Sequence, residues 1–426
     1  MFYFFYLVVI SGILYFSFKK RKFDFFTLAY FSAVIYFLPG FFGFVNEPTL
    51  INNNVIQLRV PILTETYLIM ISVLVAIIGF TIIYDYFLSK YTPNSGLFAK
   101  EIEEAVYIPQ ILFIISLLTF LFTIYETGGD LFSGKTVVWE DMGAVHIFWR
   151  VSISLLFVIS ILKKSKFYFT YSSLLLILFF LMGTRSAIAL SILAFLLIIF
   201  YKKGNKSLIK LVKPSVFILI SIFGISMFIG KRIYGSFQSN GLAGVLETIT
   251  NNEIYLESIV RSEPFTTQMI LNTVIKYDFY IGFDHLKDLP LQLLVIPSLF
   301  GADSSGFNKL FTESFFGFID YGLAYNIWAE AYAVGKWPFL ILIILLYCSI
   351  LLVLNLLIKL KDRYLKSLIL IVGVYWSFYI HRNSIETIIT FERYNIMFYI
   401  ISLVASYYFY LILRNKSRSI KSYSEK

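Results

Sequence analysis

The sequence predicts an all-α polytopic membrane protein with about eleven transmembrane helices and one large external loop. Three observations predict this fold class. The 426 residues are 58% hydrophobic and only 15% charged, whereas a soluble globular chain carries about 25% charged residues. The apolar residues gather in runs near the length of about 20 residues that crosses a bilayer. Lysine and arginine gather between alternate runs, as they do in cytoplasmic loops.

The predicted spans follow the apolar runs in chain order. No Gly/Ser-rich or Pro-rich linker and no internal repeat divides the chain, so we predict one membrane domain with one insertion. Residues 1–230 hold eight spans, residues 231–337 form the large external loop, and residues 338–426 hold three spans and a cytoplasmic tail. We expect the spans over residues 2–18, 25–45, 62–88, 106–124, 145–162, 167–182, 186–201, 214–230, 338–358, 365–381 and 391–413.

The basic residues set the orientation. The cluster Lys19-Lys20-Arg21-Lys22 follows the first span, so the first helix runs from outside to inside. The N-terminus is then outside and the C-terminus cytoplasmic. The net charge of +10 reflects this topology, and we expect no nucleic-acid partner. Strict alternation places 23 of the 36 lysines and arginines in the cytoplasmic segments 19–24, 89–105, 163–166, 202–213, 359–366 and 414–426.

Residues 167–201 are almost unbroken apolar sequence, yet they must form two helices. As one helix they would measure about 50 Å, which is too long for a bilayer core of about 30 Å. Basic pairs flank both ends, at Lys163-Lys164 and Lys202-Lys203, and belong on the same side. The chain therefore turns back at Gly183, and the turn places Arg185 at the outer surface.

A set of charged residues collects on the predicted outer side. Arginine is unusual there, because the topological bias favours arginine inside. Its planar guanidinium binds phosphate through paired hydrogen bonds and stays charged in a dry site. We therefore expect a bound anion at the outer membrane surface, for which a lipid diphosphate is suitable. The residues are Arg185, Arg261, Glu263, His285, Glu330, His381, Arg382, Glu392 and Arg393.

Each of these residues also has a structural interpretation. Arg185 can snorkel to the headgroups, and Arg261 can pair with Glu257 one helical turn earlier. Glu330 can be a carboxylate favoured near a helix N-terminus. The remaining alternatives are an ion pair of Arg393 with Glu392 or Glu386, and structural roles for His285 and His381.

The chain offers no pattern for a metal or nucleotide. Cys348 is the only cysteine, and the three histidines are far apart in the sequence, so no paired ligand spacing for zinc occurs. No Walker loop is present. We expect no metal and no cofactor.

The sequence resembles the bacterial O-antigen and capsule repeat-unit polymerases, the Wzy family, along essentially its whole length. The resemblance rests on the helix number, the late external loop and the external arginines. Its local motifs are Gly183-Thr-Arg185-Ser, Arg261, and Asn326…Trp-Ala-Glu330-Ala-Tyr332…Gly335. The chain departs from many relatives at Gly282-Phe-Asp-His285, where they have Gly-x-Ser/Thr-Tyr, and at Ser298, where they have arginine after the proline.

The resemblance implies a GT-C-like, metal-independent glycosyltransferase in the bacterial cytoplasmic (inner) membrane. Its substrates would be undecaprenyl-diphosphate-linked oligosaccharides, with membrane lipid around them. Arg185 and Arg261 would hold the donor diphosphate, Arg393 or Arg382 would complete the clamp, and Glu330, then His381, would be the base. Glu263 is a further candidate for substrate binding. A polysaccharide chain-length regulator is an open candidate partner.

Two alternatives stay open. The related O-antigen ligases share the loop placement and the external arginines. A flippase or transporter of lipid-linked sugars belongs to a different class. The absence of internal repeats and the position of the charges at the outer edge argue against transport.

Overall fold

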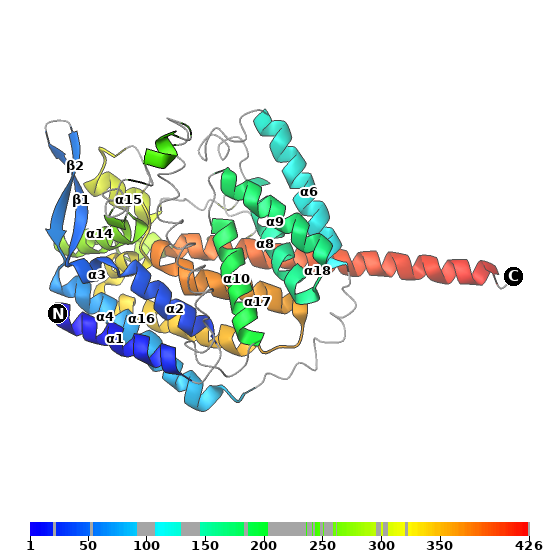
Figure 1. Ribbon diagram of the computed structural model, residues 1–426, viewed down its shortest axis with the longest axis horizontal. Coiled ribbons are helices and arrows are strands. Elements are labelled where there is room, and N and C mark those ends of the chain that lie inside the picture. The colour runs from blue at the N-terminus through cyan, green and yellow to red at the C-terminus, as the bar shows by residue number, and fades with distance from the viewer. Residues whose placement is uncertain are drawn as a thin grey trace.

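The computed structural model is built almost entirely of helices, with one small hairpin of strands (Figure 1). It describes residues 1–19, 23–51, 54–91, 107–128, 145–182, 186–202, 243–247, 259–260, 262–294, 306–319 and 323–424, with the single residues 236, 241, 250 and 300.

The N-terminal helices pack around a shared apolar core. They are α1 (Phe2–Phe18), α2 (Phe25–Tyr36), the short α3 (Pro39–Phe42) and α4 (Thr64–Ile83), which a π-turn continues to Leu88. Asp24 starts α2 by accepting the backbone N–H of Thr27 at 2.9 Å, the usual role of an N-cap carboxylate. Helix α4 contacts both α1 and α2.

A β-hairpin begins in the last two residues of the second predicted span. We expect one helix over 25–45, but α2 ends at Tyr36, the short α3 follows, and a strand begins at Phe44. Strand β1 (Phe44–Ile51) pairs antiparallel with β2 (Asn54–Pro61). Pro39 and Gly40 interrupt the helical pattern, and the following residues are rich in β-branched side chains, which favour strands. The hairpin lies beside α14 (Glu263–Lys276) in the upper left of Figure 1.

A second group of helices packs around α8 (Val145–Lys163). Its members are α6 (Ile108–Thr127), α9 (Lys166–Leu181) and α10 (Ser186–Lys202). The separation and contact of α9 and α10 confirm that the apolar run over 167–201 folds as two helices.

The C-terminal helices join the two groups. Helix α16 (Ile327–Leu357) contacts α4 and α2, and α17 (Arg363–Val374) contacts α8 and α10. A π-turn (Tyr375–Tyr379) and a 3₁₀ turn (Ile380–Arg382) extend α17. Helix α18 (Ile385–Ser424) packs on α6 and α8, and its C-terminal part projects away from the other helices in Figure 1.

Two expected boundaries in this region move. The ninth span is predicted to begin at residue 338, but α16 begins at Ile327, so the last part of the predicted external loop is helical and leads into the span. The helix is interrupted at Gly335 and Lys336, whose φ is +53°, and Pro338 follows. Glu392 and Arg393, expected to open the last span, lie inside α18.

The described part of the predicted external loop forms short elements that pack on the helix ends. They are α14, two 3₁₀ turns (Phe283–Leu286 and Leu291–Leu293) and α15 (Phe307–Phe315). The side-chain amide of Asn272 in α14 bonds to the backbone of Pro61 and Leu63 just before α4, which fixes the loop to the bundle.

Among the described residues, six helices are long and apolar enough to cross a membrane, and four shorter apolar helices accompany them. These ten correspond to ten of the eleven predicted spans. The remaining one, at 214–230, lies outside the described residues. The protein is thus an all-α protein with the character of a membrane-embedded chain.

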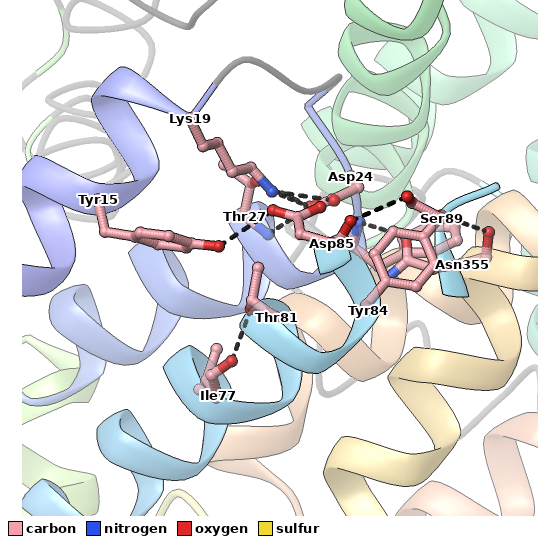
Figure 2. Close-up of polar contacts among 11 residues, drawn as sticks. Tyr15, Lys19, Asp24, Thr27, Ile77, Thr81, Tyr84, Asp85, Ser89 and Asn355 are labelled. Atoms are coloured by element: carbon pink, nitrogen blue, oxygen red, sulfur yellow. Dashed lines mark hydrogen bonds and ion pairs between the residues drawn. The ribbon is translucent and has the colours of Figure 1, made fainter. Parts of the chain in front are cut away.

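Four helix ends meet in a buried polar cluster (Figure 2), namely the ends of α1, of the π-turn after α4 and of α16, and the start of α2. Lys19, after α1, pairs with Asp24 at 2.9 Å, and both side chains are less than a tenth exposed. The Tyr15 hydroxyl donates to Asp85 at 3.1 Å. The Asn355 side chain, near the end of α16, accepts the N–H of Phe25. All four ends are predicted to be cytoplasmic. Their meeting in one cluster agrees with the predicted alternation of the first, second, third and ninth spans.

Breaking the Lys19–Asp24 pair should destabilise the protein strongly. We expect Asp24→Ala to lower the free energy of unfolding by about 3–5 kcal/mol, because Lys19 would stay buried without its partner. Asp362→Ala is the matched control. Asp362 caps α17 by accepting the N–H of Leu365 and is partly exposed, so its loss should cost about 1 kcal/mol. Denaturant unfolding in detergent measures both, and equal losses would contradict the prediction.

The orientation of the termini has a direct test. We expect Lys287→Cys to be labelled by a membrane-impermeant thiol reagent in intact cells, and Lys361→Cys to be labelled only after lysis. Both lysines are exposed, Lys287 beside the loop turns and Lys361 between α16 and α17. The native Cys348 is fully buried, so the unsubstituted chain is the blank. Labelling of Lys361→Cys but not of Lys287→Cys in intact cells would show that the predicted topology is inverted.

Candidate functional site

The site begins with the residue that starts α16. The Asn326 side chain accepts the backbone N–H groups of Trp328 and Ala329 at 2.9 and 3.1 Å. Its amide group donates to the carbonyl of Thr267 in α14 at 2.6 Å. Asn326 thus acts as N-cap and also joins α16 to the loop. This double anchoring fixes the first turn of α16, from which Glu330 projects.

Glu330 is buried, with 1% of its surface exposed, and both carboxylate oxygens are occupied. One oxygen lies 3.1 Å from His285 Nε2. The other accepts the backbone N–H of Ile385, the first residue of α18, at 2.7 Å. A helix N-terminus favours a carboxylate, because its first N–H groups lack partners within the helix. Glu330 is therefore held in one position by two elements.

The Glu330–His285 pair borders a pocket of about 180 Å³. The pocket lies between the loop turns and the starts of α16 and α18. Four carboxylates line it, from Asp284, Asp288, Glu330 and Glu386, with Lys287 as the cationic side chain. Gln292 donates to Glu386 at 3.1 Å. The pocket is polar and offers hydrogen-bond acceptors, which suits a ligand rich in hydroxyl groups.

Tyr325 faces the same carboxylates. Burial raises the pKa of its phenol, and the negative charges of Glu386 and Glu330 raise it further. The phenol is therefore neutral at physiological pH and keeps its proton.

His381, the second candidate base, lies elsewhere. It is fully buried, and its Nδ1 accepts the indole N–H of Trp328 at 3.2 Å. The rings of Tyr36, Phe37 and Tyr347 surround it within about 6 Å. His381 does not line the pocket, and these contacts support its structural interpretation.

Arg382 and Glu263 form an ion pair. The pair connects the end of the 3₁₀ turn after α17 with the start of α14, and the Arg382 guanidinium also lies 5.6 Å from the centre of the Tyr379 ring. These two sequence candidates thus contact each other. In this structure the charge of Arg382 is balanced by a carboxylate.

Arg393 lies near the pocket but forms no ion pair with Glu386 or Glu392 among the described contacts. Its guanidinium donates to the backbone carbonyls of Gln292 and Leu294 at 2.7 and 3.1 Å. It therefore holds the pocket-lining turn against α18. Arg185 and Arg261 lie outside the described residues.

Two candidate functional residues are not identified as such from the sequence. His285 is weighed there as a structural residue, because single histidines seldom form a site, yet it contacts Glu330 from a distance of 45 positions along the chain. Arg150 lies inside the predicted span 145–162 and is not among the candidate residues selected from the sequence. A charge within a span is itself a signal of function.

The structure brings together Glu330, His285, Glu386, Gln292 and Arg393, and separately Arg382 with Glu263. Within the described part of the chain, no group of three or more histidine, cysteine, aspartate or glutamate side chains is arranged to hold a metal ion. Comparison of the chain with protein family models, with curated proteins and with solved structures finds no match.

Proposed function

We propose that the protein is a glycosyltransferase that polymerises oligosaccharide repeat units linked to undecaprenyl diphosphate. The observation that carries the proposal is the buried Glu330–His285 pair at a polar pocket beneath the loop elements. A carboxylate hydrogen-bonded to an imidazole is a suitable acceptor for the proton of a sugar hydroxyl. The predicted outer position of this pocket suits lipid-linked sugars, which reach it from the membrane.

The reaction is a single displacement. The non-reducing sugar hydroxyl of the acceptor repeat unit attacks the anomeric carbon of the donor chain. A new glycosidic C–O bond forms, the bond between the anomeric carbon and the diphosphate oxygen breaks, and undecaprenyl diphosphate leaves. The hydroxyl proton passes to the Glu330–His285 pair and then to solvent. Because the Ile385 N–H already holds the Glu330 carboxylate, the side chain does not have to change conformation before the proton transfer.

The leaving diphosphate gains negative charge in the transition state and needs cations placed beforehand. Arg185 and Arg261 are proposed for this role from the sequence resemblance. Arg382 must give up Glu263 to bind a diphosphate, and Arg393 must give up two carbonyl groups. Both arginines are therefore better suited to stabilising the structure of the site than to being the main ligands of the diphosphate.

The proposed function is tested by incubating the purified protein with a lipid-linked repeat unit. A ladder of lipid-linked polymer is the expected product. Transfer of a single chain to a different lipid acceptor, without a ladder, would indicate a ligase. Movement of the substrate across a vesicle membrane without any new bond would indicate a transporter and end the proposal.

Polymerisation should survive chelation of divalent metals. We expect no more than a twofold change in rate with excess EDTA, because arginines rather than a metal ion stabilise the leaving group in this proposal. The rate of ladder formation is measured with EDTA alone and with EDTA followed by magnesium or manganese. A loss of activity that either metal restores would show that the arginine account is wrong.

A further inference from the structure

Arg150 stands in the second turn of α8, inside a segment long and apolar enough to cross a membrane. Arginine stays protonated in such surroundings, because its pKa is too high for deprotonation. A charged side chain within a span is costly and usually faces a partner or a binding site. The surroundings of Arg150 therefore indicate whether it has a partner within the protein or faces a binding site.

Arg150 differs from the other described arginines near the site. Arg382 pairs with the carboxylate of Glu263, and Arg393 donates to two backbone carbonyls. The Nε atom of Arg150 is buried and, within the described part of the chain, has no hydrogen-bond partner. The guanidinium lies beside the Phe391 ring, whose centre is 5.8 Å away.

Phe391 belongs to a stack of rings that runs from Arg150 to Arg382. Phe391 and Tyr375 are stacked with centres 3.6 Å apart and an angle of 7° between their planes. Tyr375 stacks on Tyr379 at 5.8 Å, and Arg382 lies 5.6 Å from the Tyr379 ring. Among the described residues, the ionisable side chains that act on Arg150 are the phenols of Tyr375, Tyr379 and Tyr394, and none of these is a carboxylate.

An aromatic wall attracts a cation through the negative faces of its rings, but it does not replace a missing anion. Guanidinium groups bind phosphate oxygens through paired hydrogen bonds, and neutral phenols donate to the same oxygens. The arrangement has a cation, hydroxyl donors and an apolar wall. A phosphate group attached to a hydrophobic chain supplies the anion that the described neighbours of Arg150 lack.

We propose that Arg150, together with the hydroxyl groups of Tyr375 and Tyr394, binds the phosphate of a membrane lipid at the predicted outer end of α8. The choice of a polyprenyl diphosphate as that lipid rests on the proposed function. The Phe391–Tyr375–Tyr379 stack then lies along the bound lipid diphosphate and leads toward Arg382. Arg150 is thus a binding residue on the side of the bundle formed by α8, apart from the Glu330 pocket.

The test measures binding without turnover. The unfolding temperature of the purified protein in detergent is followed as each of three probes is titrated, and the shift gives a Kd. The probes are undecaprenyl diphosphate, sodium diphosphate and phosphatidylglycerol. The variants are Arg150→Gln, Arg150→Lys and the matched control Arg59→Gln. Arg59 also lies over an aromatic ring, 4.9 Å from the centre of Phe44, but is exposed on β2.

We expect the Kd for undecaprenyl diphosphate to rise about 10- to 100-fold in Arg150→Gln, the usual effect of a lost charge-assisted hydrogen bond. The rise in Arg150→Lys should be smaller, and Arg59→Gln should bind as the unsubstituted protein does. Without ligand, Arg150→Gln should unfold at the same or a higher temperature, because a cation without a carboxylate partner among the described residues has been removed.

Several results would overturn the inference. These are an unchanged Kd in Arg150→Gln, a lower ligand-free unfolding temperature in that variant, and equally tight binding of sodium diphosphate. Binding of phosphatidylglycerol with the same dependence on Arg150 would assign the site to bulk phospholipid and overturn the polyprenyl assignment. Failure to polymerise a repeat unit would end the proposed function but leave this binding result standing.

Discussion

Replacement of Glu330 by glutamine should slow polymer formation by about 10²- to 10⁴-fold, the usual contribution of a general base. Glutamine keeps the shape of the side chain and still accepts the N–H of Ile385, so the fold should be retained. Its amide accepts no proton from a sugar hydroxyl. The rate of ladder formation from a lipid-linked repeat unit measures the loss, with membrane levels of each variant compared by immunoblot.

The contribution of His285 is found by a double-mutant cycle. If His285 and Glu330 act as one unit, His285→Gln slows the reaction, and the double variant is no slower than Glu330→Gln alone within about threefold. Glu65→Gln is the control. Glu65 accepts hydrogen bonds from Tyr332 and Trp337 at the same end of the bundle but does not line the pocket. If Glu330→Gln forms polymer as fast as Glu65→Gln, Glu330 is not the general base.

Lysine should not replace Arg185 or Arg261. A lysine offers a point charge without the planar pair of donors that matches a diphosphate. We expect each lysine variant to lose about 2–4 kcal/mol of transition-state stabilisation, or about 30- to 1,000-fold in rate. Complementation of a polymerase-deficient strain and the rate of ladder formation in vitro measure the effect.

The control for these variants is Arg59→Lys, which changes an exposed arginine on the β-hairpin and should leave the rate unaltered. An arginine that only snorkels to the headgroups accepts lysine with little loss, since both side chains reach water. Polymer of normal amount and length from both Arg185→Lys and Arg261→Lys would therefore show that these arginines are anchors.

The sequence predicts helix positions well wherever length and hydrophobicity decide them. The separation of α9 from α10 follows from the thickness of a bilayer and the basic pairs at both ends. The β-hairpin at 44–61 could not be predicted in the same way, because its first residues continue an apolar run. The run carries no sign of where it leaves the membrane, and only Pro39-Gly40 marks the break.

The candidate site is predicted less completely. Glu330 stands out in the sequence as a lone carboxylate in an apolar stretch. Its partner His285 does not, because the contact joins two segments through the packing of the loop on α16 and α18. Arg382 and Glu263 are both selected from the sequence, yet their ion pair depends on α14 packing against the end of α17. Such tertiary contacts have no local pattern.

The interruption of α16 at Gly335 and Lys336 has a mechanical consequence. A continuous helix is a rigid rod, so a change of tilt in a thicker or thinner bilayer would swing its outer end. Here the backbone ladder is broken between Ile327–Val334 and the apolar length that follows. The turns before the break are held instead by the contacts of Asn326 with Thr267 and of Glu330 with Ile385. A change in the tilt of the long apolar part can therefore be taken up at Gly335 and Lys336, and the Glu330 carboxylate keeps its position relative to α14 and α18.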